Sequence, residues 1–185
     1  MTPEPEWVDL GLPSGVLWRS SNLGATRPQS AGLFFSWGNT QGHPSGGGYD
    51  FSSEEYNLTP GSAIETDLTL EDDAANVILG NGARIPSDAE FQELINYCSS
   101  QWITRDGVNG RLFVSNNNGN SIFLPASGYY IGTLHDANGT RGRYWTSNRV
   151  SATAAVRLNF SNTAVTPQGS DERKNGLPIR PVKSA

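Results

Sequence analysis

The stretch RIPSDAEFQELINYCSS, residues 84–100, contains the element whose limits the sequence predicts most directly. Ser87 is one of the residue types that cap helix N-termini, and Glu90 stands three residues later, which completes a capping box. Apolar residues then follow at helical spacing: Phe91, Leu94, Ile95 and Cys98. We therefore predict a helix from about Asp88 to Cys98, with Cys98 on its buried face.

The residues before this helix predict short strands, loops and one further helix. Residues 7–37 alternate apolar residues with Gly, Pro and Ser, which indicates short strands joined by turns. Residues 38–62 predict a long irregular loop. The segment TLEDDAANVIL then predicts a shorter helix near Leu70–Leu79, with Thr69 as its N-cap and acidic residues in its first turn.

After Gln101 the pattern becomes rich in strands. GRLFVSNNNGNSIFLP, residues 110–125, predicts a hairpin because two apolar strands flank an Asn/Gly turn. In a later segment every second residue is apolar: Val156, Leu158 and Phe160. In a strand these side chains point inward, and Arg157, Asn159 and Ser161 point outward. The outer face is either an ordinary solvated sheet face or a surface for a partner.

The composition indicates one loop-rich domain. The chain has 185 residues, of which 21 are Gly and 11 are Pro, and its length suits a single domain over residues 1–185. The net charge of −5 argues against nucleic acid as the main partner. The chain contains no run of about 18 apolar residues, so we expect no membrane insertion. The first ten residues, MTPEPEWVDL, show no signal peptide.

The sequence contains few residues that indicate a catalytic site or a metal site. The two histidines, His43 and His135, lie in Gly-rich loops, and no Gly-x-Ser-x-Gly elbow occurs. Cys98 is the only cysteine, so we expect no disulfide. The acidic runs at residues 71–73 and 52–55 offer oxygen ligands, although the first also suits a helix N-terminus. We predict no enzyme activity, no cofactor and no metal site, with a structural calcium as the alternative.

Two arginines and the large aromatic residues give further expectations. Arg84 and Arg180 lie in the short apolar motifs ARIPS and PIRPV, and we expect both to pair with carboxylates such as Glu90 or Glu93. We expect four tryptophans in the core: Trp18, Trp37, Trp102 and Trp145. We expect three tyrosines at the rim of a binding surface: Tyr129, Tyr130 and Tyr144.

Six motifs in order resemble a known family: WVDLGLPSGVLWRSSNLGA, FFSWGNT, EDDAANVILGNGARIPSDAEFQELI, NGNSIFLPASGYY, GRYWTSN and GLPIRPV. They are similar to the Fibrobacter succinogenes major paralogous domain, and the resemblance runs from Val8 to Val182. RIPSDAEF also resembles a signature of formylglycine-generating-enzyme-like domains, whose enzymes need reactive cysteines that the lone Cys98 cannot supply. The resemblance implies an α+β domain of C-type-lectin-like fold. Such a fold has a small twisted antiparallel sheet, two helices, long loops and chain ends that lie close together.

The C-terminal part, from Trp145 to Val182, is similar to the frame of variable proteins of diversity-generating retroelements. That resemblance implies a non-enzymatic ligand-binding domain for adhesion or receptor recognition, with residues 143–172 as a display region that can be diversified. The candidate ligand-binding residues are Asn148, Arg149, Ser151, Thr153, Arg157, Asn159, Ser161, Thr166, Gln168, Ser170 and Asp171. The implied partner is a cell-surface protein or glycan. The implied location is a cell surface, the extracellular space or a phage virion.

Two other functions stay open at this point. In a structural module of a surface or pilus-like assembly, the same face would be buried against a neighbouring subunit, which allows a homo-oligomer. A calcium-dependent sugar-binding lectin is the second alternative. Such lectins carry an acid in the triplet after a Trp, whereas Trp145 is followed by Thr-Ser-Asn.

Overall fold

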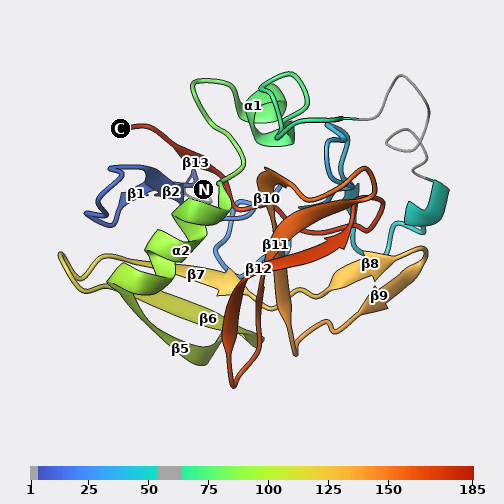
Figure 1. The fold of residues 1–185 in the computed structure, drawn as a ribbon. Helices are drawn as coiled ribbons and strands as arrows, with labels where there is room; N and C mark the ends of the chain where they lie inside the picture. The colour runs from blue at the N-terminus through green and yellow to red at the C-terminus, as the bar shows by residue number, and fades with distance from the viewer. Residues whose placement is uncertain (1–3, 54–63) are drawn as a thin grey trace.

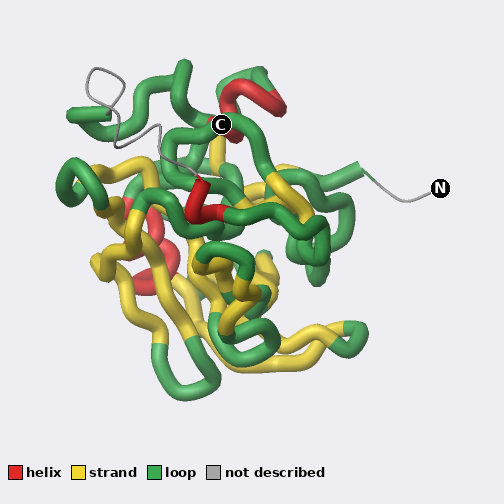
Figure 2. Tube along the Cα trace, turned by 90° about the vertical axis from the view of Figure 1, so that its right-hand side faces the viewer, coloured by secondary structure: helices red, strands yellow, loops and turns green. Residues whose placement is uncertain are grey.

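The computed structural model describes residues 4–53 and 64–185, and Figure 1 shows the order of its elements. Its helices are α1 (Ala74–Leu79) and α2 (Asp88–Tyr97), and a 3-10 turn, η1, spans Phe51–Ser53. The strands are β1 (Trp7–Asp9), β2 (Leu17–Arg19), β3 (Leu33–Phe34), β4 (His43–Pro44), β5 (Cys98–Arg105), β6 (Val108–Ser115), β7 (Ser121–Pro125), β8 (Tyr129–Ile131), β9 (Leu134–Asp136), β10 (Gly142–Arg149), β11 (Ala154–Phe160), β12 (Val165–Glu172) and β13 (Val182–Lys183). The fold is therefore α+β, with small antiparallel sheets, few helices and long connecting loops (Figure 2).

Helix α2 begins and is capped as the sequence predicts. The Ser87 hydroxyl accepts the backbone N–H of Glu90 at 3.2 Å, and the Glu90 carboxylate accepts the backbone N–H of Ser87 at 2.8 Å. Both halves of the capping box are present, so two N–H groups without helical partners are satisfied. The helix ends at Tyr97, and Cys98, buried as expected, begins β5.

Helix α1 begins at Ala74 and is capped by Asp73, so the predicted start near Leu70 and the predicted cap Thr69 are wrong. One carboxylate oxygen of Asp73 accepts the N–H groups of Ala75 and Asn76, and the other accepts the N–H of Ile85 at 2.8 Å. The Asp73 side chain is buried and binds both the helix and the RIP segment. Thr69 lies in a turn before it, where its carbonyl accepts the N–H of Asp72.

The strands form five small sheets in the described residues, in place of the one small sheet that the resemblance implies. The predicted hairpin is confirmed as β6 and β7, which pair Leu112 with Phe123, and β5 extends it to a three-stranded sheet. A second sheet has the order β10-β11-β12. β1 and β13 flank β2 in a third sheet, so the two ends of the described chain meet there, as expected. β3-β4 and β8-β9 are two-stranded.

Two hydrophobic clusters lie on opposite faces of β10 and β11. Tyr144 and Leu158 belong to a cluster that includes Trp18, whereas the next residue along β10, Trp145, belongs to a cluster that includes Trp37. Successive side chains of a strand point to opposite faces, so one strand contributes to both clusters. Trp18, Trp37 and Trp145 are buried, which confirms that part of the prediction, while Trp102 is half-buried and packs against the first cluster.

The tyrosines predicted at a rim are core residues. Tyr144 is 0% exposed, Tyr129 is 7% exposed and Tyr130 is 8% exposed. The Tyr144 hydroxyl donates to the carbonyl of Pro125 at 2.8 Å and accepts from the Asn22 side chain at 3.1 Å. Each buried hydroxyl thus has a partner, which is the condition for burying it.

The two arginines of the apolar motifs have different partners. Arg84 forms two bonds of 2.6 Å with the carboxylate of Glu90, as predicted. Arg180 is 0% exposed and pairs with no carboxylate of the described residues, so the prediction is wrong there. Its guanidinium donates to the side-chain oxygen of Asn22 at 2.9 Å and to the carbonyls of Phe123 and Arg19. Burial lowers the pKa of Arg180 to about 10, which still leaves it charged at neutral pH.

Helices long and apolar enough to cross a bilayer do not occur in the described part of the chain.

Candidate functional site

The candidate site lies on the β10-β11-β12 sheet, which stands between α2 and the β8-β9 hairpin (Figure 1). Leu158 and Phe160 are both 0% exposed, which confirms that they point into the core. Val156 is half-buried and belongs to neither cluster, so its predicted inward position is wrong. The pairing of β10 with β11 shifts opposite it, and the neighbouring Ala155 is buried on the other face, in the cluster of Trp145.

The opposite face of the sheet carries a group of bonded charged side chains. One carboxylate oxygen of Asp171 accepts from Nη1 of Arg143 at 2.8 Å and from Nε of Arg157 at 3.1 Å. Its other oxygen accepts from the Asn175 amide at 3.0 Å, and Nε of Arg143 donates to Asn159 at 3.3 Å. We call Arg143, Arg157, Asn159, Asp171 and Asn175 the arginine cluster.

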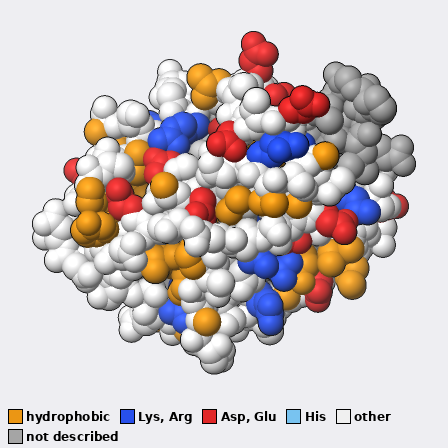
Figure 3. All heavy atoms as spheres, in the orientation of Figure 1, with side chains coloured by type: hydrophobic (Ala, Val, Ile, Leu, Met, Phe, Trp, Pro, Cys, Tyr) orange, Lys and Arg blue, Asp and Glu red, His pale blue; other side chains and the backbone are white. Residues whose placement is uncertain are grey.

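This face is less exposed than the sequence predicts. The side chains of Arg143, Arg157 and Asp171 are 14%, 15% and 9% exposed. The expectation of freely displayed donors and acceptors at Arg157, Asn159 and Asp171 is therefore wrong, because each of them bonds to another member of the arginine cluster. They are held in fixed positions and remain only partly exposed. Figure 3 shows Lys and Arg side chains close together low on the front of the molecule, over the strands of this sheet.

The ring of Tyr129 forms the floor under the arginine cluster. The guanidinium carbon of Arg143 lies 3.8 Å from the ring centroid, which is the geometry of a cation–π contact. The Tyr129 hydroxyl donates to the carboxylate of Asp136 at 2.9 Å. Burial and this bond to Asp136 raise the pKa of Tyr129. Burial, together with the charge of neighbouring Arg143, lowers the pKa of Arg157.

Strand β12 carries exposed polar residues on both faces of the sheet, with Thr166 on the face of the arginine cluster and Ser170, opposite Val156, on the other. Thr166 pairs with Asn159 of β11, and Thr166, Gln168 and Ser170 are all exposed, as predicted. The pairing shifts between Arg157 and Asn159, so β12 bulges there, and Gln168 takes a φ of +63°. Such a bulge interrupts the regular row of backbone groups on an edge strand.

Asn148 and Arg149 lie at a different place, where β10 meets the start of α2. The Asn148 side-chain oxygen accepts the N–H of Asp88 at 2.8 Å, and its amide donates to Asp67 at 3.0 Å. The backbone N–H of Arg149 donates to Asp67 at 2.7 Å, and that of Gln168 donates to Asp88 at 3.1 Å. The bond from Asp88 satisfies a backbone N–H of the first turn of α2, and the bonds together join this region to the sheet, so they are structural contacts.

Ser151, Thr153 and Ser161 lie in turns. The Ser151 hydroxyl accepts the N–H groups of Thr153 and Ala154 in the β10–β11 turn. The Ser161 hydroxyl lies 3.1 Å from that of Thr163 in the β11–β12 turn. The structure thus brings Arg157, Asn159, Asp171 and Thr166 together on one face. Gln168 and Ser170 lie within β12, and the other candidates lie at the end of β10 or in the turns that follow β10 and β11.

Sequence reasoning missed Arg143, Asn175 and the role of Tyr129. Arg143 points to the face of β10 opposite that of Tyr144. Its pairing with Asn159 follows once the register of the two strands is known. That register was not predictable from either strand alone. Tyr129 reaches the site from β8, and Asn175 reaches it from the loop after β12.

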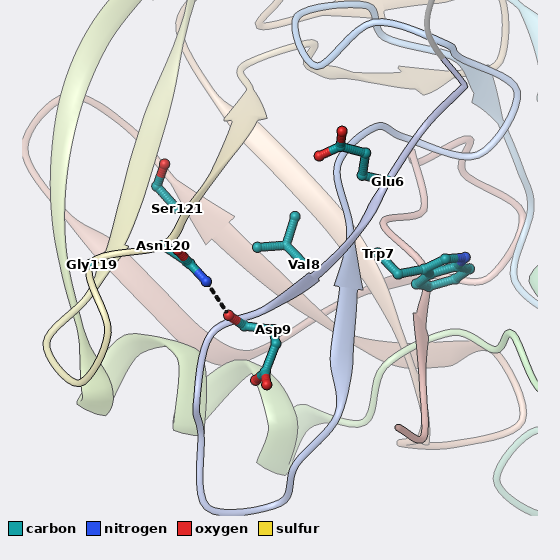
Figure 4. A pocket seen from close by; sticks show the side chains of 7 residues that line it. All are labelled: Glu6, Trp7, Val8, Asp9, Gly119, Asn120 and Ser121. Carbon is teal, nitrogen blue, oxygen red and sulfur yellow. Dashed lines mark hydrogen bonds between the residues drawn. The ribbon is translucent and has the colours of Figure 1, made fainter.

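The hollows of the described surface lie elsewhere. The one drawn in Figure 4 has a volume of about 450 Å³ and lies between the 6–9 and 119–121 segments, where Asn120 donates to the carbonyl of Asp9. Another, of about 210 Å³, is lined by Tyr130 and His135 with residues of the 44–51 loop. Neither includes any of the candidate ligand-binding residues, although the second includes Tyr130, which was expected at the rim of a binding surface.

The groups considered for catalysis or metal binding have structural contacts. His135 stacks on Tyr130, and its Nε2 lies 2.7 Å from the carbonyl of Ser127. Asp73 of the acidic 71–73 run caps α1. The other acidic run, 52–55, lies partly outside the described residues. Among the residues that are described, no three His, Cys, Asp or Glu side chains come together to hold a metal ion.

Comparison with known proteins gives one match. Residues 97–182 match the model of a family described as a domain of unknown function (DUF8237). Among curated proteins and solved structures, nothing matches the chain. The matched segment runs from the end of α2 to the first residue of β13, so the chain is similar to that family over the whole candidate site.

Proposed function

We propose that this chain is a non-enzymatic ligand-binding domain of C-type-lectin-like fold, related to the Fibrobacter succinogenes major paralogous domain. Its role would be adhesion or receptor recognition at a cell surface, in the extracellular space or on a phage virion. The partner is a cell-surface protein or glycan. The observation that carries the proposal is the arginine cluster, whose donors are fixed on a sheet and remain partly exposed.

The packing under the sheet supports this proposal. Tyr144 and Trp145 anchor β10 in two separate clusters, and both are 0% exposed. Side chains above such a support lose little conformational entropy when a ligand binds, which favours affinity. Thr166, Gln168 and Ser170 are exposed, so a change of side chain there leaves the buried clusters intact. They are therefore the positions at which this proposal places diversification among relatives.

The first prediction concerns a double variant, Asn159→Ala/Thr166→Ala. We expect its binding to intact gut bacteria and to a glycan array to fall at least tenfold, with an unchanged unfolding temperature. Removal of half-exposed and exposed polar groups normally changes stability by about 0.5 kcal/mol or less. Labelled wild-type and variant domains would be compared with and without a chelator.

The control for that experiment is Gln101→Ala, an exposed polar substitution on the separate β5-β6-β7 sheet. Equal binding by the wild type, the double variant and the control would contradict the proposal. Loss of binding in chelator would favour the calcium-dependent lectin.

A structural module of a larger assembly is the second candidate. Ile131 and Leu134 are 46% and 61% exposed at the end of the β8-β9 hairpin, and exposed apolar pairs of this kind mark contact surfaces. Oligomers that grow with concentration in sedimentation experiments, and that Leu134→Ser removes, would favour it. A monomer at all concentrations would count against it.

A further inference from the structure

Within the described residues, the ion pairs of the arginine cluster leave one positive charge unbalanced. Two guanidinium groups, of Arg143 and Arg157, share a single carboxylate oxygen of Asp171. All three side chains are at most 15% exposed. Partly buried charges are costly unless opposite charges balance them, so two arginines on one carboxylate favour the approach of another anion.

The carboxylate of Asp136, which bonds to Tyr129, does not supply that balance. Asp136 lies at the hydroxyl end of the Tyr129 ring, where it accepts from Tyr129 at 2.9 Å and from the N–H of Ala137 at 2.8 Å. In the described part of the chain, Arg143 and Arg157 form ion pairs with Asp171 alone. The other acidic residue of this part of β12, Glu172, pairs with Lys174 at 3.4 Å.

Both arginines keep donors for a ligand. Arg143 uses Nε and Nη1 in its bonds, and Arg157 uses Nε, so within the described residues Nη2 of Arg143 and both Nη atoms of Arg157 remain. Gly169, opposite Arg157 on β12, makes room for this arrangement, because a Cβ there would lie 2.6 Å from Nη1. Planar guanidinium groups with paired N–H donors match the geometry of a carboxylate.

The surroundings of the cluster suit a sugar better than a peptide. Asn159, Asn175 and Thr166 present amide and hydroxyl groups, which both donate and accept hydrogen bonds as sugar hydroxyls do. The exposed large apolar side chains of the described surface all lie off β10, β11 and β12. A protein partner normally buries aromatic or aliphatic anchors at the centre of its interface.

We propose that the arginine cluster binds the carboxylate of an acidic sugar, such as a uronic acid. Arg143 and Arg157 donate to the carboxylate, and Asn159 and Thr166 bond to ring hydroxyls. This inference rests on the proposed function, because it assigns a ligand class to the same face.

The experiment compares D-glucuronate with D-glucose, which share a ring and differ in the carboxylate. Arginine side-chain ¹H–¹⁵N NMR signals of the full chain would be followed during each titration at about 0.15 M salt, where non-specific charge effects are screened. We expect glucuronate to shift the Arg143 and Arg157 signals to saturation, with a Kd at least tenfold lower than that of glucose.

Three variants test the residues. Arg157→Gln removes a donor, and Gly169→Ala displaces the Arg157 guanidinium while keeping its charge. Both should raise the Kd for glucuronate at least tenfold, and the second keeps the test valid if the first fails to fold. Arg141→Gln, which removes an exposed arginine just before β10, is the matched control and should leave the Kd unchanged.

Three results would overturn the inference. The first is equal affinity for glucose and glucuronate. The second is an Arg141→Gln variant whose Kd for glucuronate rises as much as that of Arg157→Gln. The third is tighter binding of a short glutamate peptide than of glucuronate. If array glycans without a carboxylate bind and the Asn159/Thr166 variant loses them, the proposed function stands and only the ligand class is wrong. If no probe, array glycan or cell binds, the proposed function fails as well.

Discussion

Glu90 organises the start of α2 through a single side chain. Its carboxylate accepts hydrogen bonds from both terminal nitrogens of Arg84 at 2.6 Å and from the backbone N–H of Ser87 at 2.8 Å. Burial raises the pKa of Glu90, but the bonds from Arg84 and Ser87 outweigh it, and the net pKa is lowered. The ionised carboxylate therefore stabilises the folded state more than the protonated one does.

The substitution Glu90→Gln should lower stability in a pH-dependent way. The stabilisation by ionised Glu90 is complete above its ordinary pKa of 4.5 and is lost as the pH falls through the lower folded-state pKa. We expect a loss of about 1–3 kcal/mol near pH 7, the usual effect of leaving buried partners unsatisfied. The difference from the wild type should shrink as the pH falls below 4.5. Urea unfolding at pH 7 and at a pH below 4.5 measures it.

The exposed residue Glu172 provides the control. Glu172→Gln removes a carboxylate that is 64% exposed and should change stability little at either pH. A loss for Glu90→Gln that stays the same at low pH would show that shape, and not charge, is the important property of this side chain.

Local motifs predicted side-chain partners well, and distant partners not at all. The Arg84–Glu90 pair lies within six residues of one motif, so the sequence pointed to it. The oxygens that accept hydrogen bonds from Arg180 belong to Asn22 and Phe123, which are 158 and 57 positions away in the sequence. One is a backbone carbonyl, a group that every residue carries. The same reason explains why Tyr129 and Asn175 were not predicted beside Arg157.

Strand alternation predicted β11 correctly only where its pairing is regular. Leu158 and Phe160 face the core, as the two-residue period requires, whereas Val156, opposite the point where the pairing with β10 shifts, is only half-buried. A bulge depends on the partner strand, so one strand's sequence does not reveal it. The helices show the same contrast. The capping box of α2 is local, whereas the cap of α1, Asp73, also bonds to Ile85 of the next segment.

Gly142→Ala should destabilise the β10-β11 pair. A Cβ at Gly142 would lie 2.1 Å from the ring of Phe160, which is 0% exposed and cannot turn into solvent. Forcing an extra group into a packed core costs about 1–3 kcal/mol, so the urea midpoint should fall accordingly. Gly169→Ala on the same sheet is the matched control, since its Cβ meets only the end of the Arg157 side chain. Similar midpoints for the two variants would disprove tight packing here.

The C-terminal segment joins the two hydrophobic clusters into one structure. Leu177 and Ile179 belong to one cluster and Val182 to the other, and each is at most 1% exposed. Between them Arg180 bonds to residues of the N-terminal part and of β7. Neither cluster is complete without these few residues, so we expect them to form and break together.

One cooperative unfolding transition is therefore expected for the whole chain. Trp18 and Trp102 report on one cluster, and Trp37 and Trp145 report on the other. Tryptophan fluorescence and far-ultraviolet circular dichroism should give coincident urea curves, the mark of two-state behaviour. In the Trp37→Phe variant the fluorescence and circular dichroism curves should still coincide. Separate transitions would mean that the clusters are independent units and that the single-domain prediction is wrong.

The sheet β1-β2-β13 has a mechanical consequence. β1 and β13 both pair antiparallel with β2, so the chain before Trp7 leaves beside Arg19, whereas the chain after Lys183 leaves beside Leu17, at the other end of β2. Tension between the two ends would therefore pull β1 and β13 in opposite directions along β2. When paired strands are pulled along their length, their hydrogen bonds resist the force together. When strands are pulled apart from one end, the bonds break one after another. An adhesive domain held by both ends would thus carry force through these three strands and leave the β10-β11-β12 face outside the line of pull.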